Sequence, residues 1–121
     1  LPISVSPVIH MRRTAVGTRQ LAGTRVDAGQ KLGLFYGAAN HDPRVFAEPE
    51  RFDLRRSNAR NHVAFGFGPH NCLGAPLARL ELRVFIEEFL ARFPDYTVDS
   101  EPVYLRSDFV MGIKRLDVTL R

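Results

Sequence analysis

The chain has 121 residues, which is enough for one small domain and excludes two of ordinary size. With 45% hydrophobic and 25% charged residues, its composition is that of a globular protein and not of a disordered or fibrous one. The net charge of +4 comes from scattered arginines, and no basic run is interleaved with aromatic residues. The charge pattern therefore does not favour nucleic-acid binding.

The sequence carries few signals that indicate a cellular compartment. No stretch approaches the roughly 18 consecutive apolar residues of a membrane span, and no basic-then-apolar start predicts a signal peptide. The single cysteine, Cys72, excludes an internal disulfide and favours a reducing compartment, most simply the cytosol. Because the first residue is Leu1 and not Met, we expect a fragment or a processed product.

Strand signals dominate the first part of the chain. After a proline-punctuated lead-in, β-branched residues between positions 11 and 20 indicate a strand. Gly23 and Gly29 predict a hairpin with a glycine turn at each end, and Lys31 to Tyr36 is the next strand candidate. From Gly37 to Asn61, prolines, asparagines and several charged residues predict a helical turn and then a long irregular segment. Such a segment in a compact domain usually has a function.

A long helix is predicted from about Ala75 to Arg92, before the break at Pro94. Apolar residues recur on one of its faces at helical spacing, and they are Ala78, Leu82, Phe85, Phe89 and Phe93. We interpret this row as core packing. Because a second face is also apolar, the helix is expected to lie inside a larger body. The tail from Tyr96 to Arg121 alternates apolar and polar residues and predicts a hairpin, with its turn near residues 106–108 or 111–112.

The glycine-rich segment before this helix contains Cys72. A ligating thiolate needs electrostatic stabilisation, an open sulfur and hydrogen bonds, and a helix N-terminus just after the cysteine supplies the first and the last. Gly74 removes a side chain where a flat cofactor would approach, and Gly66 and Gly68 permit a tight turn with positive φ. Other interpretations remain open: a buried small residue, a zinc ligand beside His70, or a cysteine–histidine nucleophile pair.

Residues 65–74, Phe-Gly-Phe-Gly-Pro-His-Asn-Cys-Leu-Gly, resemble the cysteine-ligand loop of the cytochrome P450 family at every restricted position. The extension Ala-Pro-Leu-Ala-Arg-Leu-Glu over residues 75–81 is similar to its soluble bacterial class. Residues 39–53 resemble the family's meander, and Arg13-Thr14-Ala15 resembles its haem-propionate strand.

The resemblance covers nearly the whole chain and implies an α+β fragment of the mainly-α cytochrome P450 fold. Its parts would be short β-strands and hairpins, a meander loop, the cysteine-ligand loop, one long helix and a C-terminal β-hairpin. Residues 1–121 would form the C-terminal, haem-ligating part of a single domain, whose N-terminal part and central helix are missing from the chain.

The resemblance also implies haem b (iron protoporphyrin IX) as the cofactor. Cys72 would be the axial iron ligand and the catalytic thiolate, because its electron donation promotes O–O cleavage. Arg13 and His70 would hold the haem propionates through charge-assisted hydrogen bonds, although Arg13 as a surface strand residue is the alternative. The remaining cofactor-binding positions are Phe65, Gly66, Gly74 and Ala78.

Other positions would face the partners of the reaction. Arg79 would lie on the proximal face, where an acidic ferredoxin docks; a solvated helix charge is the alternative. The substrate-facing positions would be Val8, Ile9, Phe109 and Val110, of which the last two could instead be core. Arg51 would join a structural charge network with a Glu-x-x-Arg motif upstream of Pro7, but Ile3 stands near the place expected for that motif's arginine.

The expected function is that of a cytoplasmic haem-thiolate monooxygenase, which inserts one atom of O2 into an apolar small-molecule substrate. A ferredoxin-type protein would donate the electrons, and neither nucleic acid nor membrane is an expected partner. The chain alone is not expected to turn over, because it lacks the acid–alcohol pair that delivers protons to oxygen. The rival hypotheses are a haem-binding module without oxygen chemistry and a non-functional gene remnant.

Overall fold

In the computed structural model, residues 6–121 are described, so Ile3 lies outside the described part of the chain. The chain divides into two compact units. The first unit extends to Ala64 and includes Asp108–Val110, and the second comprises Phe65–Ser107 and Met111–Arg121.

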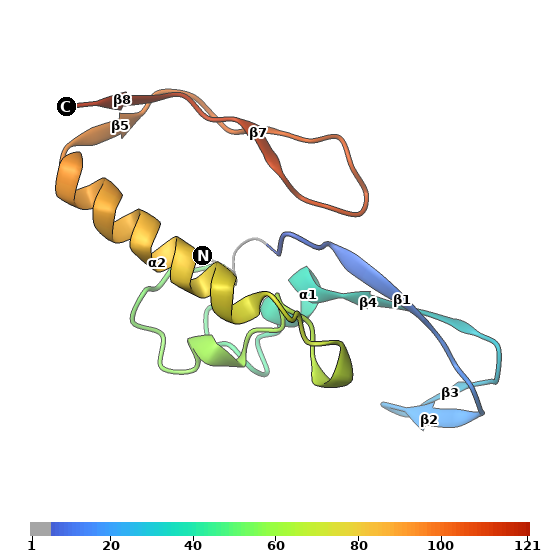
Figure 1. The fold of residues 1–121 in the computed structure, drawn as a ribbon. Coiled ribbons are helices and arrows are strands. Elements are labelled where there is room, and N and C mark those ends of the chain that lie inside the picture. Colours follow the sequence, from blue (N-terminus) through green and yellow to red (C-terminus); the bar gives the residue numbers. More distant parts are fainter. Residues whose placement is uncertain (1–5) are drawn as a thin grey trace. The chain divides into compact units, whose positions relative to one another are not determined.

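The first unit begins with two antiparallel strand pairs (Figure 1). β1 (His10–Thr14) pairs with β4 (Lys31–Phe35), and β2 (Arg19–Leu21) pairs with β3 (Thr24–Val26). Ala22 and Gly23 connect β2 to β3 with φ values of 48° and 82°. Two consecutive residues with positive φ match the right-handed twist of a hairpin, so the hairpin predicted at Gly23 is confirmed.

A short helix follows β4. The strand predicted to reach Tyr36 is one residue too long, because Tyr36 is the first residue of α1 (Tyr36–Asn40). Beyond α1, the irregular segment turns on Asp42, whose carbonyl oxygen accepts the amide hydrogens of Val45 at 3.0 Å and Phe46 at 2.9 Å. Phe46 is almost fully buried and gives this segment its own small core. A 3-10 helix, Ala59–Asn61, ends it.

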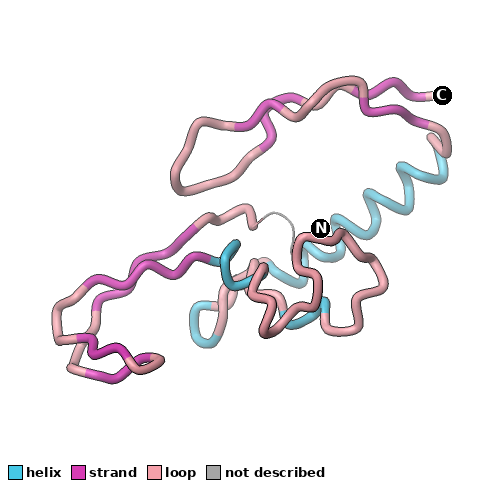
Figure 2. Tube along the Cα trace, turned by 180° about the vertical axis from the view of Figure 1, so that it is seen from behind, coloured by secondary structure: helices cyan, strands magenta, loops and turns pink. Residues whose placement is uncertain are grey.

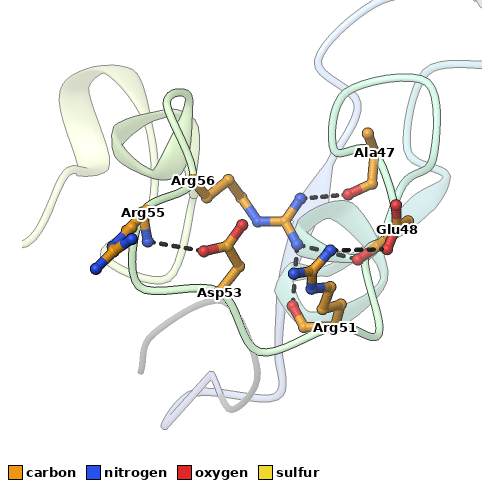
Figure 3. A network of polar contacts seen from close by, with 6 residues as sticks. All are labelled: Ala47, Glu48, Arg51, Asp53, Arg55 and Arg56. Atoms are coloured by element: carbon orange, nitrogen blue, oxygen red, sulfur yellow. Dashed lines mark hydrogen bonds and ion pairs between the residues drawn. The ribbon is translucent and has the colours of Figure 1, made fainter.

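Arg56 holds this irregular segment together (Figure 3). Its guanidinium donates hydrogen bonds to the carbonyl oxygens of Ala47, Glu48 and Arg51, the last two at 3.0 Å. Glu48 has a φ of 48°, so the backbone turns sharply at the point where Arg56 binds it. The side chain therefore satisfies carbonyl groups that have no strand partner in this loop.

The second unit is built on α2 (Ala75–Arg92), whose predicted limits are confirmed. Pro76 lies in its first turn, where a missing N–H has no cost. The tail forms a long hairpin of two paired segments (Figure 2). β5 (Tyr96–Val98) pairs with β8 (Val118–Leu120), and β6 (Val103–Tyr104) pairs with β7 (Ile113–Arg115). The predicted C-terminal hairpin is thus confirmed.

Little of the apolar surface is covered within residues 6–121. The buried apolar side chains there are Val26, Phe46, Ala64 and Ala75. On α2 the predicted row makes ring contacts, with Phe89 against Phe85 at 5.7 Å and Phe93 at 5.5 Å, but Phe85 stays 64% exposed. The larger body expected around α2 stays a prediction. No helix within the described range is long and apolar enough to cross a membrane.

Candidate functional site

The segment that contains Cys72 is a closed loop. The amide of Cys72 donates a hydrogen bond to the carbonyl oxygen of Phe65 at 2.8 Å, which joins the two ends of the loop. Within the loop, the backbone amide of Asn71 donates a hydrogen bond to the carbonyl oxygen of Gly68 at 3.0 Å. The side-chain Nδ2 of Asn71 donates a second one to the carbonyl oxygen of Gly66 at 3.3 Å. The backbone that presents the sulfur is therefore fixed by its own hydrogen bonds.

Two glycines are required for this path. Gly66 has a φ of 78° and Gly68 a φ of 63°, values that side chains with a Cβ rarely adopt. Gly68 also begins a 3-10 helix, Gly68–His70, which turns the chain back towards Cys72. The sequence predicted positive φ at both glycines, and the structure confirms it.

Cys72 is an exposed residue, and its thiol is free. A Cβ on Gly74 would lie 3.8 Å from Sγ, so the glycine leaves that side of the sulfur uncovered. The carbonyl of Cys72 accepts the amide hydrogen of Ala75 at 3.1 Å, which ties the loop to the first residue of α2. The cysteine is thus held at a helix N-terminus, with its sulfur open to a ligand.

Arg79 contacts the same loop from the second turn of α2. Its Cζ lies 4.6 Å from the centroid of the Phe65 ring, in a cation–π arrangement. Phe65 is half-buried, as is Ala78, the residue before Arg79. Sequence reasoning missed this contact, because no periodicity links a loop residue to a helix residue beyond the next turn.

The two residues expected to hold propionates lie in different units. His70 ends the 3-10 helix of the second unit and is exposed. Arg13 is half-buried on β1 in the first unit, opposite Leu32, and its Nη1 donates to the carbonyl oxygen of Arg12 at 2.9 Å.

The residues expected to face the substrate are brought together, although they come from opposite ends of the chain. The amide of Ile9 donates a hydrogen bond to the carbonyl oxygen of Phe109 at 2.9 Å. Val8 and Val110 form an isolated antiparallel bridge beside it. The Phe109 ring also meets His10 edge-on, with 6.4 Å between centroids. Backbone contacts thus join these four residues within the first unit.

The zinc alternative lacks a ligand set. Over residues 6–121 there is no group of three or more His, Cys, Asp or Glu side chains that could hold a metal ion. A tetrahedral zinc site formed by Cys72 and His70 would need two further ligands, which the described part of the chain does not supply.

Comparisons with known proteins agree with this geometry. The sequence model of the family described as Cytochrome P450 matches residues 3–120. The chain is 48% identical over 115 residues to a methyl-branched lipid omega-hydroxylase of Mycobacterium tuberculosis, a match that covers 94% of this chain and 27% of the relative. It is 40% identical over 115 residues to linalool 8-monooxygenase of Pseudomonas putida, covering 95% of this chain and 28% of that protein.

Solved structures give the same result. Cytochrome P450-153 from Novosphingobium aromaticivorans superposes with a TM-score of 0.91 at 41% identity, over 99% of this chain and 30% of that one. P450BioI, solved with an acyl carrier protein ligated to hexadec-9Z-enoic acid, has a TM-score of 0.94 at 34% identity, over 99% of this chain and 31% of that one. The chain spans less than a third of the length of these relatives. It belongs to the cytochrome P450 family.

Proposed function

We propose that residues 1–121 are the C-terminal, haem-ligating part of a single haem-thiolate monooxygenase domain. The observation that carries this proposal is the closed loop with left-handed glycines, which holds the exposed residue Cys72 at the start of α2. When bound, haem b would supply the activation of O2 from which one oxygen atom enters the substrate.

The residues around the sulfur fit such a group. A planar iron complex that is held from one side needs one soft ligand and flat, apolar surroundings. Cys72 is the ligand, Gly74 leaves space beside it, and the half-buried side chains of Phe65 and Ala78 are apolar. The left-handed backbone of Gly66 shapes the loop that holds the sulfur. Arg13 and His70 would bind the two propionates as cationic or polar donors.

The substrate would lie against apolar side chains of the segments that contain Val8, Ile9, Phe109 and Val110. The backbone contacts that join these residues across the first unit support this assignment. An apolar substrate also agrees with the names of relatives, which include a lipid hydroxylase and a linalool monooxygenase. A ferredoxin-type donor that docks near Arg79 and a cytoplasmic location remain predictions from the sequence.

The experiment is Cys72→Ser in the haem-loaded full-length protein that contains this chain. The wild type should show the Soret band of a thiolate-ligated ferrous CO complex, and the variant should lose it. A thiolate-type band that survives in Cys72→Ser would contradict the assignment. Product formation that consumes O2 in the wild type separates the monooxygenase from a haem-binding module. The 121-residue chain alone should form no more product than free haem does.

A further inference from the structure

Phe65 makes one contact through its side-chain ring and another through its backbone carbonyl. Its ring lies under the guanidinium of Arg79, with 4.6 Å between Cζ and the ring centroid. Its carbonyl oxygen accepts the amide hydrogen of Cys72 at 2.8 Å. A change in the backbone torsions of Phe65 would therefore disturb both the ring contact with α2 and the hydrogen bond that closes the cysteine loop.

The position of Arg79 on α2 is not explained by the helix itself. Arg79 lies beyond the first turn of α2, to which the effect of the helix dipole is largely confined, so the dipole does not account for its position. Two other arginines of α2 have carboxylate partners: Arg83 lies 4.0 Å from Glu87, and Arg92 lies 3.0 Å from Glu88. Within residues 6–121, the partner of Arg79 is the Phe65 ring, whose electron-rich face attracts a guanidinium.

We infer that Arg79 is a positioning residue for the Cys72 loop, because it fixes the ring of Phe65 and thereby the carbonyl that closes the loop. The inference rests on the proposed function and goes beyond it, since it gives Arg79 a role that does not depend on any electron donor. The guanidinium acts through Phe65 and does not itself contact the sulfur.

A test must therefore exclude the electron donor. In the haem-loaded full-length protein reduced with dithionite, two quantities report on the loop. These are the fraction of the ferrous CO complex in the thiolate-ligated form and the rate of haem transfer to an apo-globin acceptor. Neither quantity involves turnover or docking, so a surface charge used only for docking would leave both unchanged.

The variant is Arg79→Gln, which keeps a planar polar group and removes the charge. We expect haem transfer to accelerate about two- to fivefold, the factor that corresponds to a partly exposed cation–π contact. The thiolate-ligated fraction should fall together with this change. Arg79→Lys keeps a cation within reach of the ring and should restore part of the wild-type behaviour.

Arg83→Gln is the matched control. Arg83 lies one turn further along α2 and lines the same shallow surface hollow as Pro76, Arg79 and Leu80. Its replacement removes the same charge and touches no ring, so both quantities should match the wild type. Equal effects of Arg79→Gln and Arg83→Gln would show a general charge effect and overturn the inference.

Coupling between the two residues is measured with Phe65→Leu, which keeps an apolar side chain and removes the π face. If Arg79 acts through Phe65, Arg79→Gln added to Phe65→Leu causes no further change in haem transfer. Additive effects would overturn the inference. A wild-type protein with the thiolate band and an Arg79→Gln variant indistinguishable from it would overturn the inference alone. A wild type without that band would overturn the proposed function, and the inference with it.

Discussion

The side chain of Asn40 and the amide of Val63, 23 residues apart, are joined by a hydrogen bond of 2.8 Å to Asn40 Oδ1. Asn40 is the last residue of α1 and is fully buried. Val63 lies two residues before Phe65, where the cysteine loop begins. The irregular segment is therefore fixed at both of its ends inside the first unit.

Asn40→Ala should destabilise the full-length protein by about 1–3 kcal/mol, because it leaves the Val63 amide without its acceptor. The measurement is the midpoint of chemical unfolding. Asn58→Ala is the control, since Asn58 Nδ2 donates to the carbonyl oxygen of Val45 at 2.6 Å in an exposed place where water can replace it. A loss for Asn58→Ala as large as that for Asn40→Ala would show that burial of the amide is not decisive.

Gly68→Ala should reduce stability by about 1–2 kcal/mol through backbone strain alone. The φ of Gly68 is 63°, and a Cβ there would meet no atom within 4 Å, so steric contact does not contribute. Gly68→Asn should cost less, because asparagine tolerates the left-handed region. Thermal unfolding of the two variants side by side measures the difference. Equal losses for both variants would contradict the strain argument.

Asp42 should make part of the stability depend on pH. Hydrogen bonds from the side chain and backbone N–H of Arg44 lower the pKa of the Asp42 carboxyl to about 2. Because this folded-state pKa lies below the unfolded value near 3.8, the contribution is present above that value and is lost as the pH falls towards about 2. Asp42→Asn should remove this contribution, and the stability of the variant should fall less steeply over this range.

Arg44→Gln should weaken this pH dependence without abolishing it, because it removes the side-chain hydrogen bond, the larger cause of the lowered pKa of Asp42, and keeps the bond from the backbone N–H. The measurement is the free energy of unfolding of wild type and both variants from neutral pH down into the acid range. If either variant loses stability with falling pH as steeply as the wild type, another carboxylate is responsible.

Phe109→Ala should raise KM for an apolar substrate about tenfold or more, because burial of an aromatic ring contributes roughly 1.5–3 kcal/mol. The haem spectrum should be unchanged. The control is Phe52→Ala, which removes a ring of similar exposure, 57% against 45%, from the irregular segment. Unchanged KM and product distribution in Phe109→Ala would reduce this residue to a structural role.

Local sequence patterns predicted the parts of this structure that depend on near neighbours. The limits of α2 follow from its apolar period and Pro94, the β2–β3 hairpin follows from Gly23, and the loop turns follow from Gly66 and Gly68. Each depends on backbone preferences within a few residues.

Contacts between distant side chains could not be predicted in the same way. Nothing in the sequence pairs Asn40 with Val63, or directs Arg56 to carbonyl groups several residues before it. These bonds form only after the irregular segment has closed, so no period or turn signal precedes them. The contact of Ile9 with Phe109 was reached through the family resemblance, which grouped these residues without specifying a bond between them.

The closed loop around Cys72 also has a kinetic consequence. The bond from Cys72 to the Phe65 carbonyl and the left-handed backbone at Gly66 are formed by the chain itself, so we expect the loop to be ordered without a partner. Its loss of conformational entropy then belongs to folding and not to association. Cofactor capture would be governed by access to the sulfur, with an association rate that does not wait for a slow rearrangement of this segment.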